Sequence, residues 1–75
     1  EIRFDLPDTR LVRLEIYDLL GRKVRSLLNS TMETGEHRVE WDGRNSQGEM
    51  QPSGVYFYRI SAGDFRETRK MMMLK

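Results

Sequence analysis

The sequence lacks cysteine altogether, has only two prolines, and contains one tryptophan and one histidine. Without cysteine, neither a disulfide framework nor a cysteine-ligated zinc site is available. No stretch approaches the roughly 18 apolar residues that a membrane-spanning helix requires. The chain has 13 Lys and Arg against 12 Asp and Glu, which gives a net charge of only +1. This balance offers no electrostatic reason to expect a nucleic-acid partner.

Sequence patterns of catalysis are also missing. The chain has no nucleophile elbow, Walker loop, dinucleotide fingerprint or zinc-protease motif. The single histidine, His37, is in phase with Val39 and Trp41, which indicates a partly buried strand residue rather than a catalytic base. We therefore expect no enzyme activity and no cofactor.

The segment 42–49 is rich in side-chain oxygens and superficially resembles a calcium loop. The EF-hand spacing fails, because Arg44 stands at the third position and Ser46 at the fifth. Asp and Asn side chains commonly bond nearby backbone groups in turns, and Gly43 and Gly48 accept unusual φ values. We predict turn chemistry here, with calcium binding as the alternative.

Alternation of apolar and polar residues dominates the chain, and turn signals interrupt it at short intervals. Its 75 residues allow one small domain of modest stability. A helix over residues 11–20 fits less well than a strand, because Val12, Leu14 and Ile16 alternate with charged residues. We predict an all-β fold, a small immunoglobulin- or fibronectin-III-like antiparallel β-sandwich of about six to seven strands. The expected strands are centred on residues 2–6, 12–16, 23–28, 37–41, 55–62 and 65–74, with turns at 7–9, 18–22 and 63–64 and loops at 29–36 and 42–53.

Four aromatic residues, Trp41, Tyr56, Phe57 and Tyr58, lie in or beside the expected strands. In a sandwich this small, aromatic side chains supply much of the buried area, so we predict that they form core and near-core packing. Phe57 is the one we expect to be most exposed. A carbohydrate-binding or base-stacking platform is the alternative.

The last strand carries a basic and apolar segment, residues 69–75. Alternate members of a strand face opposite sides, so part of its Met-rich run is expected to pack inward and part to form a surface. Because methionine is flexible and adaptable, that surface suits recognition of a protein partner.

Taken in order, a set of short motifs resembles one family over nearly the whole chain. It is similar to the C-terminal sorting domain of type IX secretion (type A), which overlaps with the immunoglobulin-like domain of flagellar hook-capping proteins. The motifs are residues 2–7, 12–18, 21–24 and 35–37, then Trp41-Asp42-Gly43, Gly48, residues 53–58 and Lys70-Met71.

The resemblance implies a non-catalytic sorting signal on an exported bacterial protein. Residues 1–75 would be a single C-terminal domain behind a covalently linked cargo domain. The partners would be components of the outer-membrane translocon and a surface sortase-like protease, with no nucleic acid and no transmembrane segment. The destination would be the medium or the cell surface, reached through the periplasm. The residues implied for translocon recognition are Arg69, Lys70, Met71, Met72, Met73, Leu74 and Lys75, and those implied for structure are Trp41, Asp42, Gly43, Gly48, Gly54 and Tyr56.

The second implication is a purely structural role, as an immunoglobulin-like spacer or assembly domain like that of hook-capping proteins. The sequence does not separate the two, because their motifs overlap. A third possibility, a carbohydrate-binding module, requires exposed aromatic residues aligned on one face.

Overall fold

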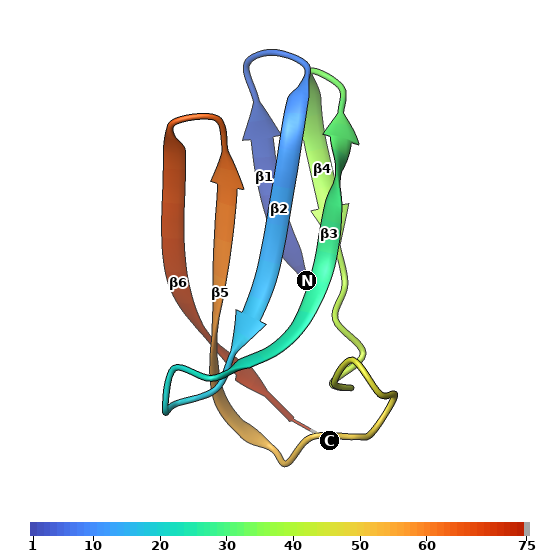
Figure 1. Ribbon diagram of the computed structural model, residues 1–75, viewed down its shortest axis with the longest axis vertical. Coiled ribbons are helices and arrows are strands. Elements are labelled where there is room, and N and C mark those ends of the chain that lie inside the picture. The colour runs from blue at the N-terminus through green and yellow to red at the C-terminus, as the bar shows by residue number, and fades with distance from the viewer. Residues whose placement is uncertain (75) are drawn as a thin grey trace.

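The computed structural model describes residues 1–74, and Lys75 lies outside the described part of the chain. Six strands form two antiparallel sheets, and no helix is present among the described residues. The larger sheet has the order β3-β2-β5-β6, and the smaller sheet pairs β1 with β4 (Figure 1). The strands are β1 (Ile2–Leu6), β2 (Arg10–Tyr17), β3 (Lys23–Met32), β4 (Gly35–Val39), β5 (Gly54–Ala62) and β6 (Phe65–Met73). The prediction of a small antiparallel β-sandwich is confirmed.

The core lies between the two sheets and follows the period-two pattern of the sequence. Val12, Leu14 and Ile16 of β2 are fully buried, and β5 places Ile60 and Ala62 beside them. The smaller sheet covers these residues with Ile2 and Leu6 of β1 and, half-buried between them, Phe4. The apolar faces predicted for the first two strands are therefore correct.

The turns predicted at 18–22 and 63–64 are also present, and β3 contains a β-bulge. Asp18 and Arg22 close the connection between β2 and β3, and Gly63 with Asp64 forms the two-residue turn between β5 and β6. The register shifts where Leu14 pairs with Leu28 but the next residue pairs with Ser26. This shift leaves Leu27 as an extra residue, which is a β-bulge.

Two boundaries differ from the prediction. The expected loop at 29–36 is mostly strand, because residues 29–32 continue β3 and pair with residues 10–13 of β2. The loop was predicted because this part of the chain is polar. An edge strand with an exposed face, however, also tolerates polar side chains. The expected strand at 37–41 is β4, Gly35–Val39, so Trp41 falls beyond its end.

The sandwich is open on the side of β6. Figure 1 shows β1 and β4 behind β2 and β3, while no strand of the smaller sheet lies behind β6. Charged residues occupy the inner side of β6, because Glu67 pairs in register with Ile60 and Arg69 with Tyr58. Glu67 and Arg69 form an ion pair with each other there. A hollow of about 270 Å³ separates this strand from β1.

Candidate interaction surfaces

The aromatic pair Trp41 and Tyr56 joins the long loop to the larger sheet. Their rings meet edge to face, with centroids 5.0 Å apart and an interplanar angle of 70°. Trp41 Nε1 donates to Arg44 O at 2.8 Å, and Tyr56 Oη donates to Pro52 O at 2.6 Å. Tyr56 is buried and Trp41 is half-buried against the core, in agreement with the predicted core and near-core packing. Both side chains thus pack and hydrogen-bond within the domain.

The glycine of the Trp41-Asp42-Gly43 motif is required by its conformation. Gly43 is buried with φ at +82°, a region that side chains with Cβ rarely adopt. A Cβ atom there would lie 3.1 Å from Met50 Sδ and 3.3 Å from Met73 Sδ. Gly48 and Gly54 also have positive φ, of +83° and +151°, but their surroundings are open.

The loop 42–49 uses its side-chain oxygens to hold its own backbone. Asp42 Oδ1 accepts from Arg44 N at 3.0 Å and from Arg25 Nη1 at 2.9 Å. Asn45 Oδ1 accepts from Gln47 N at 3.0 Å and from Glu49 N at 2.9 Å. This is the turn chemistry that we predicted. Among residues 1–74 no group of three or more His, Asp or Glu side chains is placed to hold a metal ion.

His37 has a packing role. Its ring stacks on Phe4 at a centroid distance of 5.4 Å, and its Nε2 donates to Glu33 O at 2.7 Å. The residue is half-buried in β4, in agreement with the prediction.

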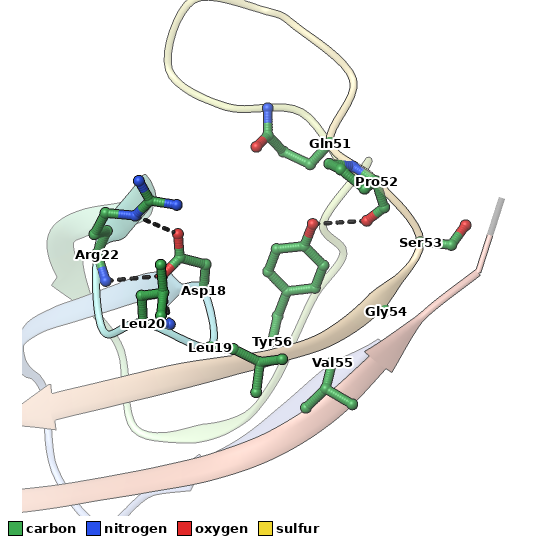
Figure 2. A pocket seen from close by; sticks show the side chains of 10 residues that line it. All are labelled: Asp18, Leu19, Leu20, Arg22, Gln51, Pro52, Ser53, Gly54, Val55 and Tyr56. Atoms are coloured by element: carbon green, nitrogen blue, oxygen red, sulfur yellow. Dashed lines mark hydrogen bonds and ion pairs between the residues drawn. The ribbon is translucent and has the colours of Figure 1, made fainter.

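A shallow hollow of about 340 Å³ lies between the β2–β3 turn and the start of β5. Figure 2 shows the Tyr56 ring facing Pro52 on one side of it and the Asp18–Arg22 pair on the other. Leu19 and Leu20 at its rim are 66% and 77% exposed. The polar groups drawn with dashed lines satisfy one another, so the hollow offers an apolar rim rather than a reactive group.

The pKa of Asp18 is held below its usual value by this turn. The main cause is the hydrogen bond that its Oδ1 accepts from Arg22 N, at 2.9 Å. Arg22 Nε also donates to Oδ2 at 2.9 Å, and Leu20 N donates to Oδ1 at the same distance. Hydrogen bonds to the charged form of a carboxylate favour that form.

Asp18 is therefore expected to make stability depend on pH. Because its pKa is lower in the folded state, its contribution is complete above the unfolded value of about 3.9 and is lost as the pH falls through the folded pKa. We expect Asp18→Asn, which keeps one acceptor oxygen, to lower the urea midpoint at neutral pH and to converge with the native protein in acid. Carbon-13 titration of the carboxyl would check the cause, and an ordinary pKa at Asp18 would contradict it.

The segment implied for translocon recognition lies on β6 and beyond its end. Met71 and Met73 pack against the core, while Met72 and Leu74 are 63% and 78% exposed. This alternation agrees with the prediction for the Met-rich run. Of the two cations before it, Lys70 points outward, and Arg69 lies on the inner side beside Glu67. The seventh residue, Lys75, lies outside the described part of the chain.

The outer face of the larger sheet is a surface that the sequence did not point to. Tyr17 and Phe57 are paired across β2 and β5 on it, and both are half-buried. Arg59 lies over the Tyr17 ring, 5.2 Å from its centroid. On its four strands this face carries five cations and one carboxylate, namely Arg13, Lys23, Arg59, Arg66, Lys70 and Glu15.

Sequence reasoning missed this charge because the residues come from four separate strands. The sequence showed only that apolar and polar residues alternate within each strand. The order of the strands in the sheet, which brings these cations onto one face, cannot be derived from the sequence of any single strand. Since the whole chain has a net charge of +1, the rest of the molecule is net negative. The lone carboxylate of the face, Glu15, is engaged by Lys23 Nζ at 2.9 Å, which lowers the pKa of Glu15.

Comparisons with known proteins identify the fold. The sequence pattern of the FlgD Ig-like domain family matches residues 2–64. The structure is similar to a crystal structure of FlgD from P. aeruginosa, with a TM-score of 0.73 and 25% sequence identity. That match covers 93% of this chain and 55% of the FlgD chain, so the chain spans about half the length of this relative. No curated protein sequence matches the chain. Because the family pattern accounts for most of the chain and the sandwich agrees with it, the chain belongs to the FlgD Ig-like domain family.

Proposed function

We propose that the chain is a non-catalytic structural module, an immunoglobulin-like spacer or assembly domain within a longer protein. The match to the FlgD Ig-like domain family over residues 2–64 is the observation that carries this proposal. The similar FlgD structure supports it, since the match covers 55% of that chain and the sandwich is therefore one part of a longer relative. The arrangement of the site agrees, because the motif residues Trp41, Asp42 and Tyr56 are committed to packing and to backbone hydrogen bonds.

The proposal is tested in the longer protein by two changes to this domain. Deletion of residues 1–75 is expected to alter the number of subunits in the assembly, calculated from its native mass by mass photometry, while the remaining domains keep their own melting transitions. Replacement by an unrelated sandwich of similar length separates the two forms of the proposal. A spacer tolerates the replacement, whereas an assembly domain does not. An unchanged number of subunits after deletion would contradict both forms.

The sorting function is a second candidate, and one feature of β6 favours it. Within residues 1–74 this strand pairs only with β5, so its other edge is open to a partner. Lys70, Met72 and Leu74 are exposed beside that edge. Recognition there by an outer-membrane translocon, followed by cleavage by a surface protease, would place the protein outside the cell. The family and structure comparisons support the structural module, and the sorting role rests on the sequence resemblance together with this exposed strand.

The alternation along β6 sharpens the export experiment. A periplasm-directed fluorescent protein carrying this domain would be expressed in a bacterium with a type IX system. If the translocon recognises β6, we expect the triple variant Lys70→Ser/Met72→Ser/Leu74→Ser to abolish export. These side chains face outward, so their replacement is expected to leave the fold intact. Ser at Leu11, Leu19 and Leu20, three other exposed apolar positions, is the matched control. If the native and substituted fusions are retained equally in the periplasm, the sorting role is contradicted, and the structural module is the proposal that remains.

A further inference from the structure

Three residues form a straight row across the outer face of the larger sheet. Arg13 of β2 is in register with Ser61 of β5, and Ser61 is in register with Arg66 of β6. Ser61 alternates with the buried residues Ile60 and Ala62, so the row faces solvent. Neighbouring strands are about 4.8 Å apart, and the two arginine backbones are therefore about 10 Å apart with a serine hydroxyl between them.

The row lies in an open hollow of about 340 Å³, whose lining includes Arg10, Leu11 and Gly63 besides the row itself. Arg10 lines one wall of the hollow, and its guanidinium group already has hydrogen-bond partners. Its Nη1 donates to Ala62 O at 3.0 Å, and its Nη2 donates to Asp8 Oδ2 at 2.7 Å. Gly63 makes room for this arrangement, since a Cβ atom there would lie 2.6 Å from Arg10 Nη1.

Arg13 and Arg66 differ from all other arginines of residues 1–74 in their partners. Neither guanidinium group makes a hydrogen bond or an ion pair within that part of the chain, whereas the guanidinium group of every other arginine does. The nearest carboxylate on the same face, Glu15, is engaged by Lys23. Two guanidinium groups thus flank one hydroxyl on a positively charged face with their donors unused.

We propose that this row is a binding site for an oxyanion, a carboxylate or phosphate group carried by a partner molecule. Guanidinium groups bind both kinds of oxyanion through two parallel hydrogen bonds, and the bonds are stronger than those between neutral groups. The Ser61 hydroxyl supplies a third donor at the centre of the row. The other cations of the face also attract an anion at long range, and Arg59 is the nearest of them along β5, two residues from Ser61. The site goes beyond the proposed structural role, because it gives the domain a specific ligand chemistry.

The test uses the isolated domain, amide chemical shifts and two probes. The probes are inorganic phosphate and a blocked hexaglutamate peptide, each titrated against chloride at constant ionic strength so that screening does not change. We expect saturable shifts at Arg13, Ser61 and Arg66. The double variant Arg13→Ala/Arg66→Ala is expected to weaken binding by about tenfold or more, as the loss of charge-assisted hydrogen bonds implies.

The opposite sheet supplies a matched control. Arg3 and Arg38 are also a directly paired cross-strand couple, on the outer side of β1 and β4. Arg3→Ala/Arg38→Ala removes the same charge and should leave the affinity within about twofold, since these residues lie on the other face. A third variant, Arg13→Lys/Arg66→Lys, keeps the charge but removes the planar fork. We expect it to bind more weakly than the native domain, because lysine lacks the bidentate geometry.

The outcomes separate the sources of the oxyanion. Tighter binding of the peptide identifies an acidic protein segment, and tighter binding of phosphate identifies a phosphorylated partner. Shifts that do not saturate, or that are equally reduced in the Arg3/Arg38 control, would overturn the proposal in favour of general attraction to a basic face. Urea unfolding of each variant verifies that the fold is retained.

Discussion

Replacing Tyr56 by Ala is expected to destabilise the domain by about 3–5 kcal/mol, the range for removal of a buried aromatic side chain. The Tyr56 side chain is only 6% exposed, meets Trp41 edge to face, and fixes the loop end through its hydrogen bond to Pro52 O. A domain of 75 residues has a total stability of about 4–11 kcal/mol, so this loss removes a large share of it. Urea unfolding followed by Trp41 fluorescence measures the change.

Tyr56→Phe separates the ring from its hydroxyl. It removes only the hydrogen bond to Pro52 O, and we expect a loss of about 1 kcal/mol. If Tyr56→Ala cost no more than Tyr56→Phe, the ring would contribute little, and the packing described for the loop would be wrong.

Replacing Leu14 by Ala is expected to cost about 2–5 kcal/mol, because it opens a cavity at the centre of the core. Leu14 is fully buried in β2 and is flanked by Leu28 of β3 and Ile60 of β5. β2 is hydrogen-bonded on both sides, to β3 and to β5, which limits how far the structure relaxes into the space. Chemical denaturation with a constant m value measures the loss.

Leu11→Ala is the control on the same strand. Leu11 faces outward and is 49% exposed, so its loss should stay within about 0.5 kcal/mol. Equal losses at Leu11 and Leu14 would show that the assignment of the two faces of β2 is incorrect.

The faces and turns of the strands could be predicted from the sequence because both are set locally. Side chains of a strand alternate, so Val12, Leu14 and Ile16 reveal the buried face without knowledge of any partner. Gly63 and Asp64 reveal a turn for a similar reason. The continuation of β3 through residues 29–32 could not be read in this way, because it depends on pairing with β2.

The candidate surfaces show the same difference between features that are set within one strand and features that depend on strand pairing. The alternation of Met71, Met72 and Met73 followed from strand geometry alone. The row of Arg13, Ser61 and Arg66 joins residues up to 53 positions apart in the sequence and exists only through the order of strands in the sheet. The near-core packing of Trp41 was predicted correctly, but its position beyond the end of β4 was missed, because that end depends on where β4 stops pairing with β1.

The pairing of β1 with β4 has a consequence for the order of folding. The β2–β3 and β5–β6 hairpins are closed by short turns, so their strands meet at little entropic cost. Ile2 must instead find Val39 across the whole first hairpin. A two-stranded sheet of this size has little stability of its own and needs the packed face of β2 beneath it. Within this domain, the strand that comes first in sequence is therefore expected to be among the last to dock, and the domain is expected to fold on the slower scale of proteins with distant contacts.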